Sequence, residues 1–211
     1  VTKRDSSRRG NNPQTIARFR GYGFPDTLRA NLAYSESIVL AASITSVTPY
    51  VVFSMNSAYD PNNSGGGGQP YYYDQFAALY TNYKVLGAKC TAIFSRTQDS
   101  TATVGPWIVG LHGSGQNTLP TSDTGQLITS TNCNWGMLTP QSDQCQVVST
   151  YSPKQAFGNE FSGEVGAAVG ANPSVNWFVK PFMAPQGASI TSNVNVTIVI
   201  DFLVEFTGLK N

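Results

Sequence analysis

Alternation of apolar and polar residues is the dominant pattern of the chain after about residue 30. It is clearest in residues 190–206, where every second residue from Val194 to Phe206 is apolar and most residues between them are polar. A period of two places successive side chains on opposite faces of a strand. The segment therefore predicts a long antiparallel strand with one face buried and the other in solvent.

Seven further segments show apolar or alternating runs bounded by Gly, Pro, Asn and Ser. They predict strands at 32–42, 47–56, 83–96, 104–112, 143–151, 160–168 and 174–183. Eight strands in one chain of 211 residues indicate a single all-β domain, either a sandwich or a barrel. The connections 57–73 and 113–142 are longer than the hairpins of a simple meander, and the second is expected to contain a helical turn near residues 126–130.

Residues 71–94 contain a change of period. Asp74 is followed by apolar residues at helical spacing, which predicts a short helix with Asp74 as its N-cap. The expected buried face of this helix comprises Phe76, Leu79, Tyr80 and Tyr83. From Tyr83 onward the period is two, and this alternation places Val85 on the outward face of a strand. The expected core face of that strand comprises Leu86, Ala88, Cys90, Ala92 and Phe94.

Charged residues make up only 12% of the chain, about half the usual share, so the surface must be largely polar and uncharged. Such a surface repels copies of itself weakly, which favours self-association. The charges are also unevenly placed. Residues 1–29 contain seven basic and two acidic residues, a net of +5, whereas residues 30–211 contain six basic and ten acidic residues, a net of −4.

We interpret residues 1–29 as a disordered basic arm, because it has few large apolar residues to bury, and residues 30–211 as the folded domain. A basic arm on a mildly acidic body indicates a polyanionic partner such as nucleic acid, and a solubilising tail is the alternative. The arm residues expected to contact nucleic acid are Lys3, Arg4, Arg8, Arg9, Arg18 and Arg20.

Motifs of the common catalytic and cofactor sites are missing from the sequence. His112 is the only histidine, which excludes metal sites built from several histidines. Ser114 lacks the glycine two residues earlier that a nucleophile elbow requires. Asp60 suits either a calcium loop or, more commonly, a turn. No enzyme activity, cofactor or metal is therefore expected.

Two further features limit the functional classes. The cysteines form no CxxC pair and are expected to be small buried residues; they are Cys90, Cys133 and Cys145. No stretch of about 18 apolar residues predicts a membrane span, and no apolar leader segment is visible at the start.

Tyrosines are concentrated in residues 71–83. Such a cluster suits either base stacking or packing within the protein and between subunits. Few basic residues accompany it, so we favour packing and interface roles. The tyrosines expected at a subunit interface are Tyr71, Tyr72 and Tyr73.

The order of these elements resembles the capsid proteins of small circular single-stranded DNA viruses, the circovirus-like group. The most specific part is the block D-Q-F-x-x-L-Y-x-x-Y-K-V at residues 74–85, followed later by S-P-K at 152–154 and W-F-V at 177–179. The resemblance implies an eight-stranded single jelly roll of two four-stranded antiparallel sheets, with a short helix between the second and third strands, which the family's lettering calls C and D. Jelly-roll capsids of satellite RNA viruses look similar.

That resemblance also implies a function. The chain would assemble with itself into a T=1 icosahedral shell of sixty copies and enclose a genome, with single-stranded DNA as the expected partner, so it would be found in virions assembled inside a host cell, with the nucleus as a candidate site. The family usually begins with a dense arginine tract, whereas here Arg8 and Arg9 stand among scattered bases.

The alternative is a carbohydrate-binding or lectin-like β-sandwich that is not viral. Its candidate binding residues are Trp107, Trp135 and Trp177, although core packing is the expectation for all three. The basic arm discriminates between the two functions, because packaging of a genome requires positive charge and sugar binding does not.

Overall fold

The computed structural model describes residues 23–41, 51–65, 68–97, 105–142, 144–158, 165–187, 190 and 192–210. The strands found there are β1 (Thr27–Leu40), β2 (Phe53–Ser54), β3 (Tyr80–Arg96), β4 (Trp107–Ser114), β5 (Cys133–Leu138), β6 (Gln144–Tyr151), β7 (Gly166–Ala168), β8 (Phe178–Pro185) and β9 (Val194–Leu209). The helices are α1 (Tyr73–Leu79), α2 (Thr124–Ile128) and α3 (Pro153–Phe157).

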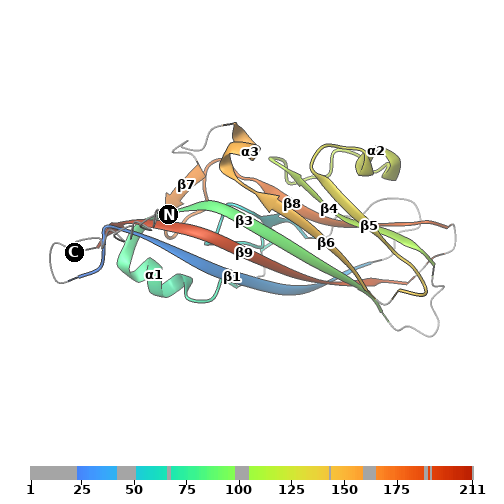
Figure 1. Ribbon diagram of the computed structural model, residues 1–211, viewed down its shortest axis with the longest axis horizontal. Helices are drawn as coiled ribbons and strands as arrows, with labels where there is room; N and C mark the ends of the chain where they lie inside the picture. Colours follow the sequence, from blue (N-terminus) through green and yellow to red (C-terminus); the bar gives the residue numbers. More distant parts are fainter. Residues whose placement is uncertain are drawn as a thin grey trace, which may run out of the picture.

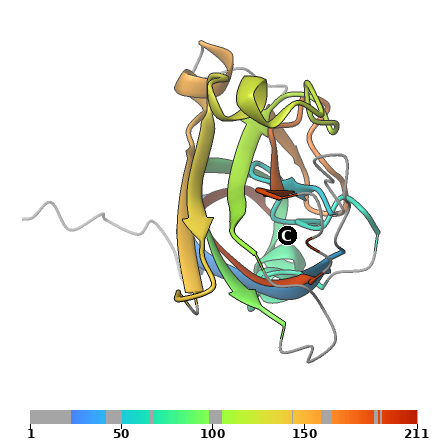
Figure 2. The same cartoon turned by 90° about the vertical axis from the view of Figure 1, so that its right-hand side faces the viewer.

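The strands form two antiparallel sheets that face each other (Figure 1). One has the order β1-β9-β3-β6, with the short β7 also paired to β3, and the other has the order β2-β8-β4-β5. Figure 2 looks along the long axis and shows the two sheets enclosing a common interior. Successive strands cross between the sheets in the order of a jelly roll, so the predicted fold class is confirmed.

The set of strands differs from the expected one at three places. Of the segment 160–168, residues 160–164 lie outside the described part, and the remainder contains the three residues of β7. The strand that completes the second sheet is β5, which the sequence suggested to be part of a long connection. The sequence pattern does not predict β5, because the side chains of β5 do not alternate between an apolar buried face and a polar exposed face. The apolar residues Trp135 and Met137 are exposed to solvent, whereas Gly136 faces β6. Of the segment 47–56, only Phe53–Ser54 forms a strand, and residues 42–50 lie outside the described part.

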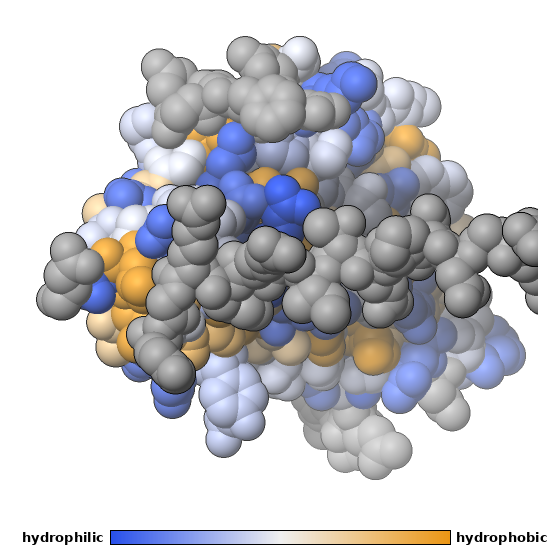
Figure 3. Space-filling model, turned by 60° about the vertical axis from the view of Figure 1, so that its left-hand side comes forward, coloured by the Kyte–Doolittle hydropathy of each residue, from blue (hydrophilic) through white to orange (hydrophobic). Residues whose placement is uncertain are grey.

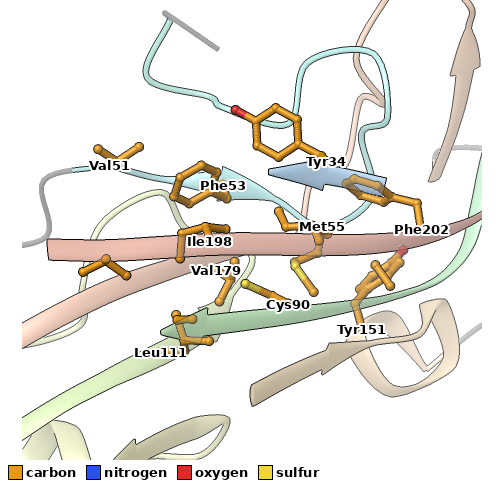
Figure 4. Close-up of a cluster of buried hydrophobic side chains, with 14 of the residues drawn as sticks. Tyr34, Val51, Phe53, Met55, Cys90, Leu111, Tyr151, Val179, Ile198 and Phe202 are labelled. Carbon is orange, nitrogen blue, oxygen red and sulfur yellow. The ribbon is translucent and has the colours of Figure 1, made fainter. Parts of the chain in front are cut away.

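The core lies between the sheets, and β9 supplies its most regular row. The expected buried row from Val194 to Phe206 is confirmed, since each of its residues is at most 1% exposed. In Figure 4, Phe53 and Val179 from one sheet lie close to Ile198 and Cys90 from the other. Full burial of each large apolar side chain contributes roughly 1.5–3 kcal/mol, so the facing rows hold the sheets together.

A β-bulge in β3 corrects the expected faces of that strand. The pairing of β3 with β9 shifts by one residue between Val85 and Gly87. The extra residue reverses the alternation, so Val85 is buried and Leu86 is only partly buried, contrary to the expectation. Beyond the bulge the expected core residues Ala88, Cys90, Ala92 and Phe94 are buried.

Helix α1 covers one end of the sandwich, as predicted, but it is not capped by Asp74. The N-cap is Tyr72, which has a φ of 69° and makes no side-chain cap hydrogen bond, and Asp74 lies in the first turn, where a carboxylate is favoured by the helix dipole. The ring of Phe76 stacks on Phe206, with centroids 5.1 Å apart. Tyr73 meets Tyr83 edge to face at 5.6 Å.

Helix α2 is the helical turn expected near residues 126–130. The Asp123 carboxylate caps it by accepting from the Gln126 N–H at 2.9 Å. Leu127 is fully buried against Ile108 and Phe182, so α2 and its flanking loop cover part of the outer face of the second sheet (Figure 1).

Tyr151 provides a test of the core. Its hydroxyl is buried with no hydrogen-bond partner among the described residues. A buried donor without a partner is destabilising. The Tyr151→Phe variant should therefore raise the free energy of unfolding by about 1 kcal/mol, as measured by urea denaturation of the unassembled protein.

Tyr73→Phe is the matched control, because the Tyr73 hydroxyl donates to the Val169 carbonyl at 2.9 Å. This variant should lose about 1 kcal/mol. Equal losses in both variants would contradict the assignment of Tyr151 as an unpaired donor.

Candidate functional site

The residues expected to contact nucleic acid lie outside the described part of the chain. They are Lys3, Arg4, Arg8, Arg9, Arg18 and Arg20, and their role stays a prediction. β1 starts at Thr27, within the segment expected to be the arm, and contains Arg29, which binds Glu205 at 2.8 Å. The Tyr80 hydroxyl donates to the Pro25 carbonyl at 2.8 Å and thus fastens the segment before β1 to the sheet.

The three candidate interface tyrosines have different environments. Tyr71 and Tyr72 are 74% and 61% exposed, and their rings meet edge to face at 4.7 Å. Tyr73 is only 1% exposed, so its assignment to a subunit interface is wrong: it packs on Tyr83 and Phe206 within the chain. The interface role of Tyr71 and Tyr72 stays a prediction.

Charge is absent from half of the outer face of the first sheet. At one end of this face Arg29, Glu205 and Lys84 stand side by side, and Asp201 and Lys89 follow. The next three rows across the strands contain no charged residue, and we call them the neutral face. The neutral face comprises Ser35, Val199, Thr91, Val148, Ser37, Thr197, Ile93, Gln146, Val39, Asn195, Ser95 and Gln144.

None of the residues of the neutral face is buried. A solvated sheet face usually carries charged side chains, and depletion of charge marks the central part of protein interfaces. Figure 3 shows the end of the molecule that is on the left in Figure 1, where apolar side chains lie in small groups between polar ones.

The three tryptophans, which were expected in the core, have different degrees of burial. Trp107 is fully buried, as expected. Trp135 is 47% exposed, so core packing is wrong for this residue, and it stands with the exposed Met137 on the outer face of β5. Trp177 is partly buried and packs its ring edge to face with Phe157 at 5.9 Å.

A buried lysine is the strongest electrostatic feature of the described residues. Lys180 on β8 is fully buried beside His112 on β4, and its Nζ donates to Ser114 Oγ and to the Gln116 carbonyl, both at 2.5 Å. Burial lowers the pKa of Lys180 to about 8. Burial, and then the charge of Lys180, lowers the pKa of His112 to about 4. Ser114 therefore accepts a hydrogen bond from an ammonium group and is not activated as a nucleophile at neutral pH.

Other expected features can be placed. Asp60 N–H donates to Ser57 Oγ at 3.2 Å, which agrees with the turn interpretation. Within the described ranges, no group of three or more His, Cys, Asp and Glu residues is arranged to hold a metal ion. In the same ranges, no helix has the length and apolar character needed to cross a membrane. Cys90 is buried, and Cys133 and Cys145 are partly buried.

The strand order assigns the chain to the class of single jelly rolls. No protein-family model matches the sequence, and no curated protein matches it. Among solved structures, the chain is similar to Cocksfoot mottle virus at 10% identity and a TM-score of 0.48, over 100% of this chain and 97% of that chain.

Two further similarities are of the same kind. Mud crab tombus-like virus matches at 12% identity and a TM-score of 0.47, over 100% of this chain and 95% of that chain. The decameric BFDV capsid protein matches at 12% identity and a TM-score of 0.44, over 85% of this chain and 98% of that chain. Similarities at this level establish neither a family nor a function for the chain.

His112 makes stability depend on pH in acid. Its pKa is lowered from 6.5 to about 4 in the folded state, so between these values the unfolded chain binds the proton more readily. Stability from this group is present above pH 6.5 and is lost as the pH falls through 4. His112→Gln should reduce the slope of unfolding free energy against pH in this window by up to about 1.4 kcal/mol per pH unit.

The measurement is urea denaturation at a series of pH values, for the parent and the variant. Carboxylates titrate in both proteins, so the difference between the slopes isolates His112. Identical slopes would show that His112 is freely protonated in the folded state.

Proposed function

We propose that the chain is a viral capsid protein that self-associates into a closed shell around a nucleic-acid genome. The observation that carries this proposal is the division of charge: a basic segment precedes a jelly roll whose first sheet carries the neutral face on part of its outer side. A fold alone does not imply a function, since jelly rolls occur in capsids, lectins and enzymes. Charge divided in this way serves both tasks of a capsid protein, contact with copies and contact with phosphates.

Self-association would proceed by many weak contacts. The neutral face, the Tyr71–Tyr72 pair and the Trp135–Met137 pair are exposed surfaces that lose little solvation of charge when they are covered. Burial of apolar area stabilises such contacts by about 25 cal/mol per Å², less the cost of fixing the subunits. Symmetric repetition then closes the shell, and the resemblance of residues 74–85 to circovirus-like capsid proteins favours a T=1 particle of sixty copies.

The basic segment would face the enclosed genome. Residues 1–26 contain six basic and two acidic residues, and Arg29 does not join them because it binds Glu205. Contacts between arginine and phosphate release counterions and read no base sequence, so the binding is strong at low salt and unspecific. The same resemblance favours single-stranded DNA as the genome and the virion as the location, with assembly inside the host cell. In this function the chain is structural and not an enzyme.

Assembly can be tested by placing a charge on the neutral face. Ser37→Glu puts a carboxylate on an exposed position of β1 within this face, and it should prevent shell formation under conditions where the parent assembles, because the carboxylate would be desolvated at the contact. Size-exclusion chromatography and negative-stain microscopy report the outcome.

Asn31→Glu is the matched control, since Asn31 is exposed on the same strand but lies at the charged end of the face. It should assemble normally. Normal assembly of Ser37→Glu would remove the neutral face from the subunit contact. A parent protein that stays monomeric under every salt and pH condition would disprove the capsid function itself.

The role of the arm can be tested by salt dependence. Replacing Arg4, Arg8 and Arg9 by Gln should weaken binding of a labelled oligothymidine and reduce the slope of log K against log salt by about 2, or about 0.7 for each arginine. Fluorescence anisotropy over a salt series gives the slope. Arg29→Gln is the control and should leave the slope unchanged, because Arg29 is paired with Glu205. Equal slopes for the parent and the triple variant would contradict a phosphate-binding arm.

A further inference from the structure

A cleft of about 310 Å³ opens where an edge of each sheet meets the other. β5 contributes one wall, the end of β6 and helix α3 contribute another, and Trp177 also lines it. We call it the β5–β6 cleft. The two sheet edges approach closely here because Gly136 has no side chain: a Cβ at this position would lie 2.6 Å from Cys145 Sγ.

Among the described residues, the lining of this cleft is polar and carries no charge. Most of these side chains are amides or hydroxyls, and none of the described lining residues is Asp, Glu, Lys, Arg or His. The amide and hydroxyl side chains are those of Asn132, Asn134, Ser149, Thr150, Tyr151, Ser152 and Gln155. Amide groups donate and accept hydrogen bonds, and so do hydroxyls, so the cleft offers both kinds of partner at several points.

The walls are held in place by hydrogen bonds within the chain. Ser152 caps α3, because its Oγ accepts from the Gln155 N–H at 3.3 Å. The Gly113 N–H donates to the Asn132 carbonyl at 3.0 Å. The Trp177 backbone is fixed at both ends: its N–H donates to Asn56 Oδ1 at 2.8 Å, and its carbonyl accepts from the Met55 N–H at 2.8 Å. Fixed walls reduce the entropy lost on binding.

We propose that the β5–β6 cleft binds a neutral sugar. Sugar hydroxyls each donate and accept hydrogen bonds, which matches the amides and hydroxyls of Asn134, Thr150 and Gln155, and the indole of Trp177 supplies an apolar wall for the C–H groups of the ring. Among the described lining residues, a phosphate or carboxylate ligand would find no cation, and a metal ion would find no carboxylate. An aliphatic ligand would leave the polar walls unpaired.

The proposal does not depend on the capsid function, because the described lining residues of the cleft all belong to one copy. If the chain does form shells, the cleft gives them a means of attachment to glycans of a host cell. If the chain does not, the cleft remains a site of a sugar-binding protein. Trp177 is then the one of the three candidate tryptophans that lies at the site.

The test uses the full chain and defined oligosaccharides. Lactose, maltotriose and N,N′-diacetylchitobiose are the neutral probes, and sialyllactose and a heparin fragment are the charged comparators. Calorimetric titration gives the affinities, and the side-chain amide resonances of Asn134 and Gln155 locate the site by NMR. At least one neutral probe should bind with a Kd of about 1 mM and shift these resonances.

Two variants that alter only exposed side chains test the site. Asn134→Ala and Gln155→Ala should each weaken binding of the neutral probe about fivefold, as expected for one lost hydrogen bond. Gln75→Ala is the matched control, because Gln75 is an exposed glutamine on another short helix, α1, and it should leave the affinity unchanged.

Three outcomes would overturn the proposal. One is the failure of all neutral probes to bind at about 20 mM. Another is binding that Asn134→Ala and Gln155→Ala leave unchanged. The third is a charged comparator that binds the cleft more tightly than every neutral probe. Shell formation by the same variants is followed separately by size-exclusion chromatography, so failure of the sugar proposal and failure of the capsid proposal are distinguishable.

Discussion

The pairing of β9 with β3 is the constraint on which the rest of the structure depends. β9 is flanked by β1 and β3 over almost its whole length, so its backbone groups are satisfied on both sides. With the backbone paired, the strict alternation from Val194 to Phe206 delivers one continuous apolar row to the interior and leaves polar groups outside. The second sheet packs on this row, and α1 closes the end through the contact of Phe76 with Phe206. The cleft and the neutral face take their positions from this arrangement.

The sequence predicts those parts of the fold in which local pattern and packing agree. β9 and α1 are of this kind, because several apolar residues in succession follow the spacing of a strand in β9 and of a helix in α1. The bulge at Leu86 is not, since one inserted residue reverses the faces of β3 without breaking the alternation on either side of it. Gly87 was the available signal, because a glycine within a strand often marks a bulge.

The candidate site is less accessible to sequence reasoning, for two physical reasons. Burial of an aromatic residue depends on which neighbours reach it, so nothing local separates Tyr73 in the core from the exposed Tyr71 and Tyr72. Likewise, β5 is recognised only when its partner β4 is known, because Trp135 and Met137 are apolar residues on an exposed face. The neutral face needs the register of four strands before its lack of charge becomes visible.

A buried charge on the second sheet helps to hold the cover of that sheet in place. Lys180 is buried without a carboxylate partner among the described residues, and its ammonium is compensated only by the Ser114 hydroxyl and the Gln116 carbonyl. These bonds hold the start of the loop that carries α2 over the second sheet. The outer face of the second sheet is thus covered by this loop and α2, except near Trp135 and Met137. Among the described residues, no segment gives the neutral face of the first sheet a comparable cover, so this sheet, unlike the second, exposes a broad uncharged surface.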